Sequence, residues 1–422
     1  MVRQLYKAVL AVALSFPSFI YGATIDTMTG VFDNRVKTLS LSNPDSFMSP
    51  PVINLSSGSR LALNFDIIGD SHEYLRYRLV HCNADWLPSR LLEPEYVGGF
   101  NETEVSDYAY SSNTYVHYVN YNIELPGEEM KFLASGNYLL QVYPEGNPEQ
   151  LILQQRFYVS EDSVRVSGGA SGRTDVGLNT EYQQLDFTLS TMLPQSANLY
   201  QDVVVTVTQN NRPETTRTIA HPLRVEGDKI VYSHLPDLIF RAGNEYRRFE
   251  TVRADYAGMH ADSVKFGGSN WHSWLTPDES RVDKDYTYDS TQHGRFKIDE
   301  YSADDPDLGA DYVTVHFTLD IPELTGGEVY VDGDFSFHRF GRFNKMVYDR
   351  GKGAYVAEIP LKQGSYNYQY VVASPEGNVD PSPIEGDKYE TRNEYLVCVY
   401  YRAPGSRGDR LIGTAVIIPG QV

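Results

Sequence analysis

Residues 76–100 read RYRLVHCNADWLPSRLLEPEYVGGF, and this stretch carries the strongest local signal in the sequence. Its first residues alternate with a period of two, which places successive side chains on opposite faces of a β-sheet. A turn is predicted at residues 83–85, and the glycine pair at residues 98–99 predicts another. Residues 81–86 combine a histidine, one of the two cysteines, an aspartate and one of the three tryptophans, which raises the hypothesis of an active site.

A structural role is the better interpretation of this set. A cysteine nucleophile needs a base within hydrogen-bond reach, but neighbouring residues of a strand point to opposite faces, which separates His81 from Cys82. We therefore predict that Cys82 and Trp86 pack in a core, and that Asp85 shapes the turn by accepting hydrogen bonds from nearby backbone N–H groups. A core position predicts a loss of about 3–5 kcal/mol for Trp86→Ala.

The rest of the chain repeats this pattern of strands and turns. Runs such as LALNFDII at residues 61–68 and YVHYVNYNI at residues 115–123 are separated by Gly, Pro and Asn at short spacing, which is typical of β-sandwiches. Residues 135–159 predict a hairpin with EGNP at its tip. No long amphipathic pattern predicts a helix. The sequence therefore predicts an all-β protein of three consecutive β-sandwich (immunoglobulin-like) domains.

Two changes of composition divide the chain. Residues 167–172, SGGASG, suit a linker, and residues 301–311, YSADDPDLGAD, suit a second boundary. The last two strand-like runs, residues 394–402 and 409–418, are expected to form a hairpin. We expect an N-terminal domain at residues 24–161, a middle domain at 162–300 and a C-terminal domain at 301–422.

The first 23 residues have the features of a secretory signal peptide. Arg3 and Lys7 supply positive charge, residues 8–20 form a short apolar run, and Gly22 and Ala23 are small residues suited to cleavage. The apolar run is too short to span a bilayer, and no cysteine follows it for lipid attachment. We expect a soluble, exported product that is not a lipoprotein and does not insert into the membrane.

The charge of the chain bears on its partners. Its formal net charge is −20, from 56 acidic and 36 basic residues. Nucleic acid is excluded as a partner, because binding phosphates requires a basic face. The acidic balance is otherwise explained by solubility, although it allows a basic partner.

The two cysteines are Cys82 and Cys398. An oxidising compartment permits a bridge, which would join the first domain to the last. Each lies in a strand-like run, where a thiol packs as a small hydrophobic group, so two buried free thiols are the favoured interpretation.

No known catalytic or metal-binding pattern occurs in the sequence. It has no HExxH, CxxC, GxSxG or phosphate-binding glycine loop. Asp305, Asp307 and Asp311 could donate oxygens to calcium, but their spacing is not that of an EF-hand, and an acidic solvated linker is favoured. We predict no enzyme activity, cofactor, metal or small-molecule substrate.

Two aromatic clusters are candidates for an interface. Trp271 and Trp274 form the first, and Phe337, Phe340 and Phe343 lie in the second. Exposed aromatic side chains suit a sugar-binding platform or a protein interface, whereas buried ones would fill a core. The sequence leaves these alternatives open.

Several unusual strings give the chain a family resemblance. HCNADW, SSNTYVHYVNY, SGNYLLQVYP, DYVTVHFTL, VYVDGDF, IEGDKYETRNEYLVCVYYR and RGDRLIG occur in this order and span the chain after residue 23. They resemble the type IX secretion system plug protein family of Bacteroidetes.

The resemblance implies a non-enzymatic, periplasmic protein that closes the inner mouth of a giant outer-membrane β-barrel translocon. It also implies an early-set immunoglobulin-like C-terminal domain and gives no catalytic residues. The alternative is an exported carbohydrate-binding β-sandwich protein, which the early-set domain together with Trp271 and Trp274 would suit. A hydrolase is the least favoured interpretation.

Overall fold

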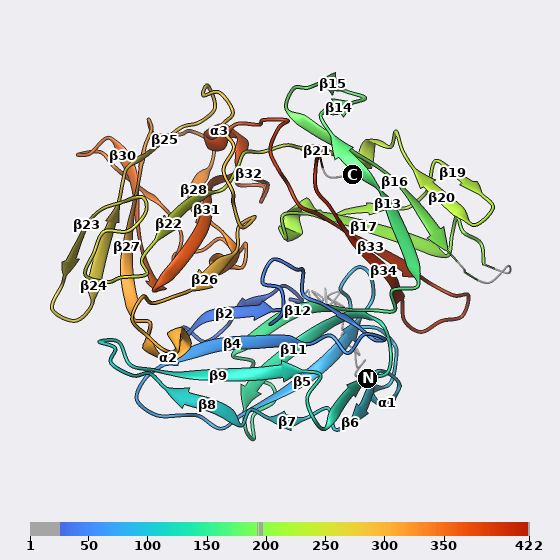
Figure 1. Cartoon of the computed structure of the whole chain (residues 1–422), viewed down its shortest axis with the longest axis horizontal. Helices are drawn as coiled ribbons and strands as arrows, with labels where there is room; N and C mark the ends of the chain where they lie inside the picture. The colour runs from blue at the N-terminus through green and yellow to red at the C-terminus, as the bar shows by residue number, and fades with distance from the viewer. Residues whose placement is uncertain (1–25, 192, 194–196, 421–422) are drawn as a thin grey trace, which may run out of the picture.

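The computed structural model in Figure 1 describes residues 26–191, 193 and 197–420, so the predicted signal peptide lies outside the described residues. The structure is built almost entirely of strands, which form three lobes around a common centre. Within the described ranges, the helical segments are single turns: α1 (Glu93–Tyr96), α2 (Pro306–Gly309), α3 (Ser382–Glu385), η1 (Pro213–Thr215), η2 (Pro236–Leu238) and η3 (Asp334–Ser336). The predicted all-β class is confirmed.

The first unit, the lower lobe in Figure 1, is a sandwich of two sheets. One sheet has the order β1-β12-β11-β5-β7, with β3 paired to β12, and the other has the order β2-β4-β9-β8. Its strands are β1 (Gly30–Val31), β2 (Val36–Ser42), β3 (Val52–Asn54), β4 (Leu61–Ile68), β5 (Leu75–Cys82), β6 (Val97–Gly99), β7 (Thr103–Glu104), β8 (Asp107–Tyr110), β9 (Tyr118–Leu125), β10 (Met130–Phe132), β11 (Gly136–Pro144) and β12 (Leu153–Ser160).

Alternation along β5 explains how this unit forms its core. Leu75, Tyr77 and Leu79 are buried between the sheets, whereas Arg76 and Arg78 are half-buried on the other face. The predicted hairpin is also present, because β11 pairs antiparallel with β12.

The second unit contains strands from the middle and from the end of the chain. Its two sheets have the orders β13-β16-β20-β19, with β21 on β16, and β18-β17-β33-β34. The strands are β13 (Val164–Ser171), β14 (Arg173–Thr174), β15 (Gly177–Leu178), β16 (Tyr182–Thr191), β17 (Val203–Gln209), β18 (Arg217–Ile219), β19 (Arg224–Glu226), β20 (Lys229–Tyr232), β21 (Ile239–Arg241), β33 (Tyr395–Tyr401) and β34 (Arg410–Ile417).

The third unit is a sandwich formed by the residues between β21 and β33. The strands β26, β28, β32 and β22 surround β31, and the second sheet has the order β23-β24-β27-β30-β29, with β25 on β27. The strands are β22 (Arg247–Glu250), β23 (Ala261–Phe266), β24 (Trp271–Leu275), β25 (Asp278–Glu279), β26 (Phe296–Ile298), β27 (Tyr312–Asp320), β28 (Glu328–Asp332), β29 (Val347–Asp349), β30 (Ala354–Lys362), β31 (Gly364–Ala373) and β32 (Val379–Asp380).

The strand pairing differs from the division that composition suggested at residue 301. Strands β22 to β26 pair within the third unit, and the predicted terminal hairpin of β33 and β34 is present but joins the second unit through β17. The physical reason lies in β33, whose seven residues are all buried. One face packs in the core of the second unit, and the other face covers Ala84 and Tyr158 of the first unit.

Candidate functional site

The stretch that first suggested catalysis is a turn that joins two units. Asp85 accepts a hydrogen bond from the N–H of Leu87 at 3.0 Å, and Asn83 accepts one from the N–H of Asp409 in the second unit at 3.1 Å. His81 Nε2 lies 3.0 Å from the carbonyl oxygen of Ser135. Burial raises the pKa of the Cys82 thiol to about 12, so the thiol stays protonated and unreactive at neutral pH.

Trp86 is half-buried, and its position differs from the expected core site. The backbone of Trp86 has φ 64°, in the left-handed region, within the turn that follows β5. The guanidinium carbon of Arg156 lies 4.2 Å from the centre of the ring, and Tyr158 contacts it at 5.3 Å between ring centroids. Trp86 therefore belongs to the wall of a cavity at the junction of the units.

The position of Trp86 changes the expected cost of removing it. Part of the ring already contacts solvent, so Trp86→Ala should lower the free energy of unfolding by about 1–2 kcal/mol rather than the 3–5 kcal/mol of a core substitution. The lost stacking with Arg156 is included in that figure. Urea denaturation measures it, with Tyr256→Ala, at an exposed loop position, as the matched control. A loss above 3 kcal/mol would place Trp86 back in a core.

Both cysteines are free and buried. Cys82 ends β5 in the first unit, and Cys398 lies in β33 between the second unit and Tyr158. Burial also raises the pKa of the Cys398 thiol to about 12.

The two candidate tryptophans lie on β24 near the edge of a sheet. Both are half-buried, with Trp274 stacked on His316 at 4.4 Å and Trp271 against Phe266 at 5.3 Å between ring centroids. Phe266 is exposed on the edge strand β23 and also contacts exposed Tyr115 of the first unit. We call Tyr115, Phe266 and Trp271 the edge aromatic patch.

The three candidate phenylalanines do not form one platform. Phe340 packs on Tyr330 at 5.4 Å between ring centroids, inside the third unit. Phe337 has φ 57° and packs against the core of the first unit, while Phe343 is 48% exposed. Phe337 and Phe343 both line a cavity between the first and third units.

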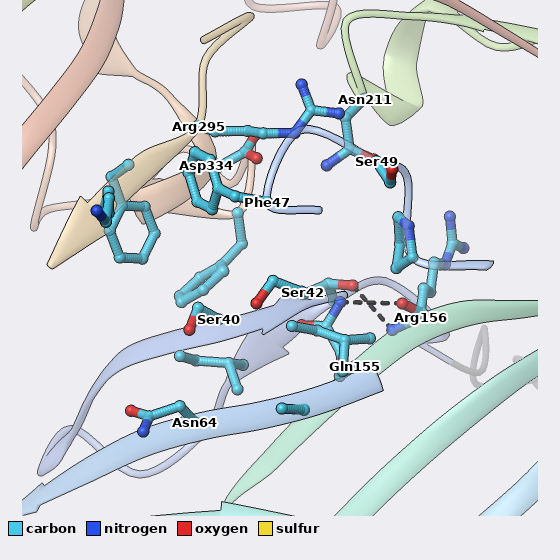
Figure 2. Close-up of a pocket in the computed structure, with 18 of the residues that line it drawn as sticks. Ser40, Ser42, Phe47, Ser49, Asn64, Gln155, Arg156, Asn211, Arg295 and Asp334 are labelled. Atoms are coloured by element: carbon cyan, nitrogen blue, oxygen red, sulfur yellow. Dashed lines mark hydrogen bonds between the residues drawn. The ribbon is translucent and has the colours of Figure 1, made fainter. Parts of the chain in front are cut away.

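Two cavities lie at the junction of the units. The larger, of about 460 Å³, is lined by all three units; Figure 2 shows Ser40, Ser42 and Arg156 along one side of it, and Arg295 and Asp334 on the other. The smaller, of about 330 Å³, lies between the first and third units and is lined mainly by apolar and aromatic side chains. Leu39, Phe296 and Phe337 line both cavities, which are therefore adjacent.

Buried charges join the units around these cavities. Lys362 of the third unit donates to Asp66 of the first at 2.7 Å, and both side chains are fully buried. Arg295 and Glu394 form a second buried pair at 2.7 Å where the second and third units meet. Sequence reasoning missed these contacts, although Asp66 lies within the apolar run LALNFDII, where a charge signals burial with a partner.

The acidic segment near residue 305 has a structural role. Asp311 is buried and accepts hydrogen bonds from the N–H groups of Tyr115 and Val116 in the first unit, at 2.7 and 3.0 Å. The interpretation as a solvated linker is therefore wrong for Asp311.

Among the described residues, no group of three or more His, Cys, Asp or Glu side chains is arranged to hold a metal ion. The helices of the described part include none long and apolar enough to cross a membrane.

Comparison with known proteins identifies the family of the first unit. The family model for the first domain of type 9 secretion system plug proteins matches residues 36–161, which is the first unit almost from end to end. The chain belongs to the type 9 secretion system plug family.

A solved structure extends the likeness beyond that domain. A hypothetical protein from Parabacteroides merdae ATCC 43184 is 38% identical to this plug-family chain, with a TM-score of 0.90 over 93% of this chain and 99% of the other. A putative membrane-anchored protein from Corynebacterium diphtheriae matches at 7% identity over 91% of this chain and 92% of the other, with a TM-score of 0.14, and supports no inference. Among curated proteins, none matches the sequence.

The strings that carried the family resemblance hold the plug-family fold together at its junctions. HCNADW forms the turn in which Asn83 accepts a hydrogen bond from the N–H of Asp409. The string at residues 312–320 begins with Tyr312, whose hydroxyl donates to Asp66 across the boundary between units at 2.7 Å. These two strings therefore encode contacts between units. Members of this family are components of secretion machinery.

Proposed function

We propose that this protein is a non-enzymatic periplasmic plug that binds and closes the periplasmic end of the giant outer-membrane β-barrel translocon of a type IX secretion system. The observation that carries the proposal is the family match over residues 36–161. A periplasmic location agrees with the signal-peptide features of residues 1–23.

The way in which the units are joined supports a role as a stopper. Buried pairs such as Lys362 with Asp66 and Arg295 with Glu394 tie the three units together. A surface that is already rigid loses little conformational entropy on binding, which favours a wide contact with the rim of a pore.

The edge aromatic patch is the proposed contact with the translocon. Exposed aromatic side chains are enriched at protein interfaces, and the neighbouring edge strand β23 pairs only with β24 among the described strands. Such an edge can add a strand from a partner.

The proposal predicts recovery of the barrel with the tagged protein. Affinity purification from outer membranes solubilised in mild detergent should retain the giant barrel protein in its cargo-free state. Phe266→Ser should reduce its recovery about tenfold, because it removes a large apolar contact. Leu178→Ser, at an exposed position in the second unit, is the matched control and should leave recovery unchanged. No barrel in the wild-type eluate would contradict the function; equal recovery with Phe266→Ser would contradict only the contact surface.

A second assay tests the alternative proposal, which is an exported carbohydrate-binding protein. Electrophoresis through gels containing starch or glycogen would retard a protein that binds these polysaccharides. We expect no retardation of the full chain, because Trp274 stacks on His316 instead of offering a free ring face there.

A further inference from the structure

The cavities at the junction follow the open edge of a strand. β2 is the outermost strand of its sheet, and within the described residues it pairs with β4 alone. Residues 36–39 of β2 line the smaller cavity and residues 39–42 line the larger one. An edge strand presents backbone N–H and C=O groups that have no strand partner. The N–H of Val36 already donates to Asp33 O, and the register of β2 shifts between Lys37 and Ser40, so the regular free edge along the cavity wall is that of residues 40–42.

The opposite wall of the larger cavity presents a second open edge. β26 pairs antiparallel with β31, and in the described part of the chain this is its sole strand partner. The N–H of Asn367 donates to Arg295 O, and the N–H of Asp299 donates to Gln363 O, so residues 295 and 299 bond toward β31. Since the bonding direction alternates, the backbone groups of Phe296 and Ile298 face away from β31, and both residues line the larger cavity.

The two ends of this groove differ in chemistry. The smaller cavity, at the Val36 end of β2, is lined by Phe32, Phe335, Phe343 and Leu361 among others. The larger cavity, at the Ser42 end, is lined mainly by polar and charged side chains, and the charged ones include Arg156, Arg295, Lys297, Asp307 and Asp334. Arg156 does not line the smaller cavity. Figure 2 shows Arg156 among the residues that line the larger cavity.

Arg156 is a half-buried cation without an acidic partner among the described residues. Its Nε donates to Thr27 O at 2.6 Å and its Nη2 donates to Thr27 Oγ1 at 3.1 Å. No carboxylate of the residues that the structure describes lies within 4 Å of it, and Asp26 is bound by both terminal nitrogens of Arg339. Burial lowers the pKa of Arg156 to about 10, so an anion from outside would relieve an unfavourable environment.

We propose that the groove between β2 and β26 binds an extended segment of another protein, with an apolar side chain at the Val36 end and a carboxylate at Arg156. The free backbone edges supply main-chain hydrogen bonds, as in strand addition, and the two ends supply selectivity. A segment of about five to seven residues spans β2 at about 3.4 Å per residue. The proposal stands apart from the plug function, because it is measured on the isolated protein.

Selection from a random seven-residue peptide library displayed on phage tests the proposal. The full chain from residue 24 is the bait. Enriched peptides should carry an aromatic or large aliphatic residue toward one end and aspartate, glutamate or a free carboxyl terminus toward the other. Synthetic copies should compete with one another for one site, and methylating alternate backbone nitrogens of such a peptide should abolish its binding, because it removes strand-type donors.

Variants at the two ends of the groove complete the test. Arg156→Gln should weaken binding of a selected peptide about 10- to 100-fold, the effect of losing one charge-assisted hydrogen bond. Phe343→Ser, at a half-exposed position, should weaken it several-fold without disturbing the fold. Arg60→Gln, at an exposed arginine outside both cavities, is the matched control. Failure to enrich any peptide, equal affinity for Arg156→Gln and wild type, or occupation of the groove by a second copy of the chain would each overturn the proposal.

Discussion

Replacing Lys362 with methionine should lower the free energy of unfolding by about 3–5 kcal/mol at pH 7. The substitution removes the only cation that contacts Asp66 among the described residues and leaves the carboxylate fully buried between the first and third units. Methionine has a similar length, so the loss reports the missing charge rather than a missing volume.

The surroundings of the pair explain why removing one partner should lower the free energy of unfolding so much. Asp66 also accepts hydrogen bonds from Tyr312 at 2.7 Å and Asn120 at 2.8 Å, and the Lys362 ammonium lies 4.0 Å from the centre of the Tyr118 ring. Burial raises the pKa of Asp66 even beside Lys362, because the lost hydration outweighs the attraction of the ammonium. The intact pair therefore adds little net stability, whereas an unpaired carboxylate is costly.

The pH dependence distinguishes this mechanism from simple loss of packing. Without Lys362 the pKa of Asp66 rises further, so the folded state binds a proton that the unfolded state lacks, and stability increases as the pH falls from 7 toward 5. The deficit of Lys362→Met should shrink over that range. Lys352→Met, at an exposed turn, should change stability by less than about 0.5 kcal/mol. A deficit below 1 kcal/mol, or one independent of pH, would contradict a buried ion pair.

A double substitution isolates the pair. Asp66→Asn combined with Lys362→Met leaves no buried charge, so it should recover part of the loss caused by Lys362→Met alone. Hydrogen exchange should place the opening of Lys362→Met at residues 305–316, which cover Asp66 from the third unit.

The features that the sequence predicts correctly are those encoded by neighbouring residues. The period of two along residues 75–82 specifies β5 and its buried Leu75 and Leu79, and the turn residues EGNP specify the hairpin of β11 and β12. Side-chain alternation needs no knowledge of the rest of the chain, so composition and period were sufficient for the all-β class.

The features that the sequence does not predict depend on distant segments. The local pattern of the run EYLVCVYYR predicts a strand but not its partner, and only the tertiary structure shows that the partner is β17. Its continuous apolar character is the signal that could have predicted burial on both faces, as found for a strand between two units. The boundary expected at residue 301 failed because composition marks loops and does not show which strands pair.

The candidate site shows the same limit. The sequence predicts that Trp86 packs in a core, but in the structure it lies in a left-handed turn on a cavity wall beside Arg156. Arg156 itself follows a glutamine pair in an ordinary strand, and nothing in that run distinguishes it from a surface arginine. Only the structure brings it next to the open edges of β2 and β26.

His338 is the second position where a large effect is expected, because it lies between two carboxylates. Its Nδ1 is 3.0 Å from Asp332 and its Nε2 is 3.1 Å from Asp334, an arrangement that requires the imidazolium form. The attraction of Asp332, reinforced by Asp334, raises the pKa of His338 well above its usual value despite burial. The pKa of Asp332 falls to about 2 although burial opposes it, because His338, Arg212 and a hydrogen bond from Gln369 favour the charged form.

We expect His338→Gln to cost about 3 kcal/mol at pH 6, since the amide can replace one hydrogen bond but not the charge. The contribution of His338 is complete below its unfolded pKa of about 6.5 and is lost as the pH rises through the higher folded pKa. The contribution of Asp332 is present above about 3.8 and is lost as the pH falls through about 2. The deficit of the variant should therefore be largest and nearly constant between about pH 4 and pH 6.5, and should become smaller as the pH rises above that range. Urea denaturation between pH 4 and pH 10 measures it, with exposed His221→Gln as the control. An equal deficit at pH 6 and pH 10 would show that His338 contributes by packing and not as a cation, because only a charged imidazole loses its interaction with Asp332 as the pH rises.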